Sequence, residues 1–325
     1  MTKVCIYGAG AIGGWIAHGL ARAGCSVSVV ARGAALAALG QHGVRVNHAN
    51  VTTSQAVRAA SSPVELGVQD LVVISVKAPA LPDVAAQIAT LIGPNTMVMT
   101  AMNGVPWWFL QGFGASYAGQ GLKSIDPRGE IATAIAPQHI VGCVVHASCS
   151  LDAPGLVRHH FGNKLIIGEP SGEKTQRLGL LAELLEKAGF EAQISEQIQK
   201  DIWFKLWGNM TVNPISALTG ATTDLIMGDD LVRGFISSVM LEAKEIGARL
   251  GITIDQQPED RHAVTLKLGA FKTSMLQDVQ AGKAVELDAL VTAVKELGML
   301  TQVPTPCTDA LLGLARLQAR VRGLY

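Results

Sequence analysis

Residues Val4-Cys5-Ile6-Tyr7-Gly8-Ala9-Gly10-Ala11-Ile12-Gly13-Gly14 decide the fold of this chain. A short apolar run, typical of a buried strand, leads directly into a GxGxxG motif and then into an apolar helical pattern. In such a strand-turn-helix unit Gly8 permits the tight turn, Gly10 lets the backbone approach a diphosphate, and Gly13 allows close helix packing. The helix N-terminus also presents unpaired N–H groups that attract phosphate. The motif predicts a dinucleotide site formed by Gly8, Ala9, Gly10, Ala11, Ile12 and Gly13.

The first part of the chain alternates strand and helix patterns up to about Ser195. Strand patterns occur at 4–7, 27–30, 71–76, 97–100 and 141–147, and helical patterns at 12–23, 82–92 and 175–188. This alternation is typical of a parallel sheet covered by helices. We therefore expect residues 1–194 to form a Rossmann-type, doubly wound α/β domain.

The remainder of the chain has a different pattern. Apolar residues recur with the helical period over 196–212, 231–250, 259–280 and 283–297, and strand-like runs disappear. Residues 195–325 are expected to form an all-α domain for substrate binding and dimerisation. Long helices of this kind favour a homodimer.

The residue after the second strand bears on cofactor choice. Sites that prefer NAD carry an acidic residue about 20 positions after the glycines, where it binds the ribose hydroxyls. Here the strand ends at Val30 and Arg32 follows. A guanidinium can bind a 2′-phosphate through two charge-assisted bonds, whereas a carboxylate would repel it. Arg32 therefore favours NADP(H) over NAD(H); a solvated loop arginine is the simpler alternative.

In the helical half, two sets of polar side chains lie on helices that are otherwise mostly apolar, and both are candidates for contacts with a ligand. Asp201, Lys205, Asn209 and Asn213 recur every four residues on a segment that is otherwise mostly apolar. Such a stripe either faces water or lines a polar pocket, and asparagine, a poor helix former, suggests a fixed hydrogen-bonding array. On the helix expected from residue 283, Glu286 falls on the apolar face. A buried ion pair and a substrate contact both account for that carboxylate.

Composition excludes several classes of function. The 325 residues are 49% hydrophobic, and 26 basic residues balance 26 acidic ones, which argues against nucleic-acid and anionic-membrane partners. The apolar runs are far shorter than the roughly 20 residues of a membrane span, and a strand at the start leaves no room for a signal peptide, so we expect a cytoplasmic protein. Scattered cysteines and histidines predict no metal site, and no GxSxG elbow indicates a hydrolase.

Taken together, these motifs resemble the ketopantoate reductase (2-dehydropantoate 2-reductase) family over nearly the whole chain. The resemblance is carried by GAGAIGG at 8–14 with Arg32, SVKA at 75–78, MNGV at 102–105, WFKL at 203–206 with Asn209 and Asn213-Pro214, and KTSMLQD at 272–278 followed by Glu286. It implies NADPH-dependent reduction of ketopantoate to pantoate, on the route to pantothenate and coenzyme A.

The resemblance also implies roles for individual residues. Lys205 would be the general acid, Asn103 would lie at the junction of nicotinamide and substrate, and Lys77 would contact the cofactor. Glu286 would hold a substrate hydroxyl or organise the nicotinamide side. The substrate-binding residues would be Lys205, Asn209, Asn213 and Ser274.

Two departures from the family leave alternatives open. Many members carry an asparagine where this chain has Thr223, which offers a single donor. The stretch 103–146, which includes Trp107 and Trp108, is longer than in the shortest members. A reductase of a different 2-keto acid is therefore the nearest rival, and a sensor that binds NADPH without turnover is a more distant one.

Overall fold

The computed structural model describes residues 1–113, 117 and 119–325. By its contacts the chain divides into two compact units. The sheet unit contains Met1–Met102 and Arg128–Ile198, and the helical unit contains Asn103–Pro127 and Gln199–Tyr325. The functional division at residues 194 and 195 stays a prediction.

The sheet unit is a Rossmann-type domain with an extended, mixed sheet. Its described strands are β1 (Lys3–Tyr7), β2 (Ser26–Val30), β3 (Val44–His48), β4 (Val51–Gln55), β5 (Arg58–Ala60), β6 (Leu71–Ile74), β7 (Met97–Thr100), β8 (Ile140–Ala153), β9 (Leu156–Gly168) and β10 (Glu191–Ile194). Strands β5-β2-β1-β6-β7-β8 are parallel neighbours, which is the 3-2-1-4-5-6 order of dinucleotide-binding sheets.

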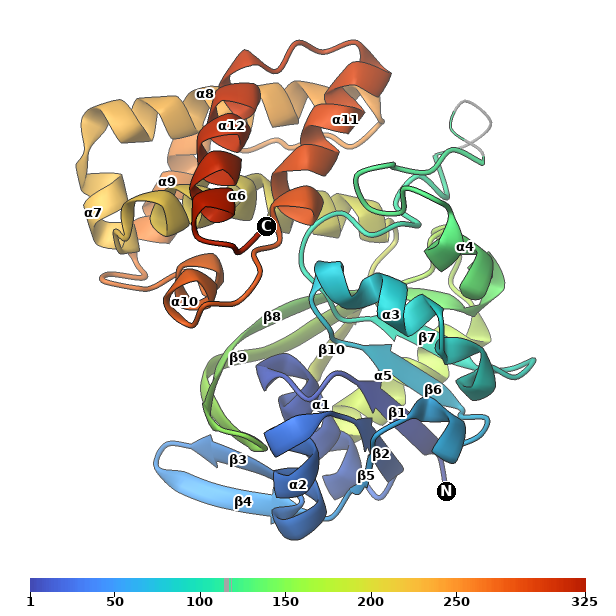
Figure 1. Ribbon diagram of the computed structural model, residues 1–325. Helices are drawn as coiled ribbons and strands as arrows, with labels where there is room; N and C mark the ends of the chain where they lie inside the picture. Colours follow the sequence, from blue (N-terminus) through green and yellow to red (C-terminus); the bar gives the residue numbers. More distant parts are fainter. Residues whose placement is uncertain (114–116, 118) are drawn as a thin grey trace. The chain divides into compact units, whose positions relative to one another are not determined.

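At one end, antiparallel strands extend the parallel sheet that the sequence predicts. Strands β8 and β9 pair antiparallel because only Pro154 and Gly155 connect them, too few residues for a parallel crossover. Strand β3 then pairs with β9, and β4 pairs antiparallel with β3. Figure 1 shows the two long green strands curving toward β3 and β4. This extension gives the sheet its curl.

The helices of the sheet unit include one that the curled sheet wraps. They are α1 (Ala11–Arg22), α2 (Gly33–His42), α3 (Leu81–Ala85), α4 (Glu130–Ala134) and α5 (Gln176–Lys187). Helix α1 lies against β2, β3, β8 and β9. A Cβ on Gly14 would come within 2.7 Å of Val157 on β9, so a glycine is needed where strand and helix approach. The expected helix over 82–92 is instead α3 followed by a 3-10 turn.

The helical unit is all-α in its described residues. Its helices are α6 (Ile198–Thr219), α7 (Thr223–Gly228), α8 (Asp230–Arg249), α9 (Pro258–Leu266), α10 (Ser274–Gln280), α11 (Ala293–Thr301) and α12 (Pro306–Val321). Helix α6 is anchored by its indoles: Trp203 donates to the Ala243 carbonyl at 3.2 Å and Trp207 to that of Met240 at 2.7 Å. Among the described residues, no helix is long and apolar enough to cross a membrane.

Two expected helices of this unit differ from the structure. The helix expected over 259–280 is broken into α9 and α10, with Gly269 in the left-handed region between them. The helix expected from residue 283 begins later, with a π-helical turn at Asp288–Thr292 that continues into α11. The expectation that Glu286 lies within a helix is therefore wrong, because Glu286 precedes this turn.

Candidate active site

The glycines after β1 form the turn that the sequence predicts. Gly8 has a φ of +121°, and a Cβ there would lie 2.9 Å from the backbone nitrogen of Val76. A Cβ on Gly13 would lie 2.1 Å from the Gly8 carbonyl oxygen, so neither position admits a side chain. A Cβ on Gly10 would meet nothing within 4 Å. The outer side of the turn is thus open, and α1 begins there with no side-chain cap.

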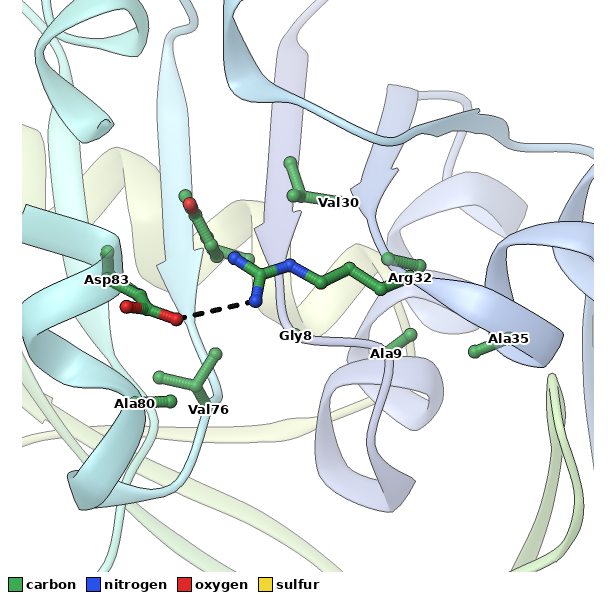
Figure 2. Close-up of a pocket in the computed structure, with 11 residues that line it drawn as sticks. Gly8, Ala9, Val30, Arg32, Ala35, Val76, Ala80 and Asp83 are labelled. Carbon is green, nitrogen blue, oxygen red and sulfur yellow. Dashed lines mark hydrogen bonds and ion pairs between the residues drawn. The ribbon is translucent and has the colours of Figure 1, made fainter. Parts of the chain in front are cut away.

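A cavity of about 300 Å³ opens beside this turn. It is lined by Tyr7, Gly8, Ala9, Val30, Ala31, Arg32, Ala35, Val76, Ala80, Asp83 and Val84. Most of these side chains are apolar, and the two charged ones stand at its edge. In Figure 2 the Arg32 side chain extends from the end of β2 toward Asp83 on α3. The apolar lining with one arginine at its edge suits an apolar group that carries an anionic substituent.

Arg32 and Asp83 form an exposed ion pair across this cavity. Arg32 Nη1 lies 3.3 Å from Asp83 Oδ2, and the two side chains are 68% and 64% exposed. Exposed pairs of this kind hold weakly. The guanidinium can therefore exchange this carboxylate for a ligand phosphate. Lys77 lies in the same β6–α3 connection as Val76 and is half-buried.

The polar stripe of the helical half lies on α6, as expected. Lys205 is half-buried, and its Nζ donates a hydrogen bond of 2.8 Å to Oδ1 of Asn103. The two residues are 102 positions apart in the sequence. Since the amide oxygen accepts from Lys205, the Asn103 NH₂ group is left to donate elsewhere. An ammonium and an amide that can donate therefore lie side by side, and two such donors can stabilise a developing alkoxide.

Asn209 and Asn213 continue this stripe along α6. Asn213 is 7% exposed and Asn209 is half-buried. Within the described part of the chain neither amide makes a side-chain hydrogen bond, and neither has a fully buried polar atom. Both can thus donate to a ligand. Ser274 is exposed at the first position of α10.

Glu286 and Thr223 occupy different settings from those expected. Glu286 is half-buried just before the π turn, and its backbone carbonyl accepts from Leu290 N–H at 3.1 Å. Thr223 is 1% exposed, and its hydroxyl donates to the Gly269 carbonyl at 2.6 Å. The only proton of that hydroxyl is thus used in a hydrogen bond within the protein. Thr223 therefore fixes α7 to the loop before α10 and offers no donor to a ligand.

The long stretch 103–146 is tied to α6 by its aromatic residues. Trp107, Trp108 and Phe109 are buried, and the Phe109 ring lies 5.8 Å from that of Trp203. They form part of the interior of the helical unit. Residues 114–116 and 118 of this stretch lie outside the described residues. No group of three or more possible metal ligands occurs among the residues that the structure describes.

Comparison with known proteins gives the family. The model "Ketopantoate reductase PanE/ApbA" matches residues 4–107, and "Ketopantoate reductase PanE/ApbA C terminal" matches residues 197–319. The chain is 46% identical to a 2-dehydropantoate 2-reductase of Mesorhizobium japonicum, with 99% of each chain covered. The chain belongs to the ketopantoate reductase family.

Solved structures agree with this assignment. A crystal structure from Ralstonia solanacearum MolK2, described as a candidate ketopantoate reductase, is 53% identical, has a TM-score of 0.95 and covers 100% of both chains. The 2-dehydropantoate 2-reductase of Geobacter metallireducens GS-15 is 25% identical with a TM-score of 0.85, covering 97% of this chain and 99% of its own. Membership makes the chain an oxidoreductase of a nicotinamide-dinucleotide-dependent family.

The sheet unit of this ketopantoate reductase family member fits a dinucleotide. Gly8 and Gly13 close the turn at distances that exclude any Cβ, whereas the open side of Gly10 leaves room for a diphosphate at the α1 N-terminus. The cavity beside it holds an accessible arginine. No sequence motif marks Asp83, which follows an ordinary Pro-Ala-Leu-Pro run and becomes relevant only through its position opposite Arg32.

Proposed function

We propose that this chain reduces ketopantoate to pantoate with NADPH. The observation that carries the proposal is the bond between Lys205 Nζ and Asn103 Oδ1, because it fixes a proton donor on α6 beside the amide of Asn103, which can act as a second donor. Family membership supplies the reaction class.

The residues of the sheet unit would hold the cofactor. The backbone of residues 8–13 would bind the diphosphate, and Arg32 would bind the 2′-phosphate in place of Asp83. Lys77 is proposed as a further cofactor contact. When bound, NADPH supplies the hydride that is added to the carbonyl carbon.

The residues of the helical unit would handle the keto acid. Lys205 donates a hydrogen bond to the keto oxygen and transfers its Nζ proton as the C=O bond becomes C–O⁻. Asn103 keeps the ammonium in position. The free amides of Asn209 and Asn213, together with Ser274, would bind the rest of the acid, and Glu286 would accept a hydrogen bond from a substrate hydroxyl.

A reductase of a different 2-keto acid is the second candidate. The observation that favours it is Thr223, whose hydroxyl donates to the Gly269 carbonyl and so has no proton left to donate to a substrate. A substrate with fewer hydroxyl groups than ketopantoate would lose fewer hydrogen bonds from the missing donor at Thr223.

The test is steady-state oxidation of NADPH, followed at 340 nm, with ketopantoate beside a panel of 2-keto acids. A kcat/KM for ketopantoate well above the others, on the order of 10⁴ M⁻¹s⁻¹ or more, supports the proposal. Preference for another acid selects the second candidate. NADPH binding without turnover of any acid would instead identify a sensor.

We also propose that the chain forms a homodimer through α12. Leu314, Leu317 and Val321 are 58%, 62% and 80% exposed, and their spacing places them on one stripe of the helix. Light scattering should give twice the mass of 34.1 kDa. Leu317→Asp should give the monomer, because it places a charge in the apolar stripe. The cytoplasmic location stays a prediction.

A further inference from the structure

Arg261 is held against the same helix that carries Lys205. It lies on α9, and its guanidinium carbon is 5.6 Å from the centre of the Phe204 ring. A Cβ on Gly208 would lie 2.6 Å from Arg261 Nε and 3.0 Å from Nη2. The guanidinium therefore rests directly on the α6 backbone, at a position where only glycine leaves room for it.

Within the described part of the chain, the Arg261 cation has no anionic partner. Arg261 Nε is buried without a hydrogen-bond partner, and no ion pair of Arg261 occurs among the described residues. Burial lowers the pKa of Arg261, and no carboxylate opposes that effect. Buried charges in proteins are normally paired. The chain itself follows this rule at Arg177, which binds the buried Glu169 through two nitrogens.

The turn of α6 beneath Arg261 is the turn that bears the proposed acid. Phe204 immediately precedes Lys205, and Gly208 immediately precedes Asn209. Neighbouring residues on a helix are about 100° apart around its axis, so the guanidinium lies on the face of α6 next to the stripe of donors. Arg261 is half-buried rather than fully enclosed, which leaves part of it open to a ligand.

A 2-keto acid carries a carboxylate that could serve as the anionic partner of Arg261. Its carboxylate is bonded to the carbon that is reduced, and a planar guanidinium binds carboxylates through two parallel bonds. We propose that Arg261 binds the carboxylate of the keto acid while Lys205 binds the keto oxygen. This assignment rests on the proposed function for the identity of the ligand. The anion site itself rests only on the contacts of Arg261.

Direct binding tests the assignment without turnover. The probe is 2-oxoisovalerate, with 3-methyl-2-butanone as the ketone that lacks the carboxylate, each titrated by ligand-observed NMR with and without NADP⁺. In Arg261→Met the Kd for the acid should rise by on the order of 10²-fold, while binding of the ketone stays unchanged. Arg249→Met is the matched control, because Arg249 is paired with Glu245 on α8.

Gly208→Ala gives an independent test that keeps the arginine. The new methyl group would displace the guanidinium, so this variant should also weaken binding of the acid relative to the ketone. Arg261→Lys should recover part of the affinity, since it keeps the charge but loses the fork of donors. If Arg261→Met does not fold, Gly208→Ala and Arg261→Lys together test whether Arg261 binds the carboxylate.

The possible outcomes separate the two proposals. Equal losses for acid and ketone, or no loss for either, would overturn the carboxylate assignment and leave Arg261 as a support for Phe204. If the wild type binds 2-oxoisovalerate through Arg261 but reduces no keto acid, the proposed function fails and the anion site stands. If the wild type reduces a keto acid and Arg261→Met retains wild-type affinity for 2-oxoisovalerate, the proposed function stands and the anion site fails.

Discussion

The backbone N–H of Val105 donates to the carbonyl of Ala289 at a distance of 2.8 Å. Ala289 lies in the π turn that follows Glu286, and Val105 lies two residues after Asn103. Between them, Gly104 has a φ of +83°, and a Cβ there would lie 2.6 Å from the Ala289 oxygen. π turns recur at functional sites. This one fixes the loop that presents Asn103 to Lys205.

Gly104→Ala should therefore lower kcat without changing the affinity for NADPH. The added methyl group pushes the loop from Ala289 and moves Asn103 away from Lys205; a displacement of about 1 Å at a reacting group can cost on the order of 10²-fold in rate. Steady-state kinetics and NADPH fluorescence titration measure both quantities. Gly251→Ala is the control, because Gly251 also has a positive φ but faces open space. Wild-type kcat in Gly104→Ala would contradict this role for the loop.

Lys205→Met should reduce turnover by on the order of 10³-fold while NADPH binds as in the wild type. Methionine keeps the length of the side chain but can donate neither a proton nor a hydrogen bond. Lys200→Met on the same helix changes an exposed lysine and should leave the rate unchanged. Retained turnover in Lys205→Met would exclude Lys205 as the acid.

Arg32→Ala should weaken NADPH by at least about tenfold and leave NADH nearly unaffected, because only NADPH carries the 2′-phosphate. Asp83→Ala should have the opposite effect on the affinity for NADPH. Removal of a carboxylate that competes for the guanidinium should tighten NADPH up to about fivefold, the range of an exposed ion pair. Dissociation constants for both cofactors, from fluorescence titration, test this pair. Parallel changes for NADPH and NADH would rule out phosphate recognition by Arg32.

The sequence predicted those parts of the fold that depend on local patterns. The GxGxxG turn, α1 and α8 lie where their glycines and apolar periods place them. The curl of the sheet depends on pairing between β3 and β9, residues more than 100 positions apart, which no local pattern encodes. Helix α12 did carry a signal, with Pro306 at its first position, and was missed.

The candidate site divides in the same way. The stripe of Lys205, Asn209 and Asn213 follows from helical spacing alone, and α6 confirms it. The bond between Lys205 and Asn103 joins distant segments, and only the resemblance placed both residues in one site. Arg261 lies in an ordinary run of charged residues at the start of a helix. That it has no anionic partner among the residues the structure describes becomes visible only in three dimensions.

His18 should make the stability of the chain depend on pH. The side chain is 7% exposed on α1, and its Nε2 lies 2.9 Å from the Thr53 hydroxyl. Burial, and then the charge of Arg22, lower the pKa of His18. As pH falls below the ordinary value of about 6.5, the unfolded chain takes up a proton here that the folded chain does not. Folding should therefore lose stability in that window.

Urea unfolding at pH 7.5 and pH 5.5 measures this contribution. His18→Gln keeps a polar group for Thr53 but cannot titrate, so its unfolding free energy should fall less between the two pH values than that of the wild type. His42→Gln is the control, because it makes the same substitution at an exposed histidine, at the end of α2. If the wild type and His18→Gln lose equal stability on acidification, the protons are taken up elsewhere, and the contact between α1 and β4 tolerates a charged histidine.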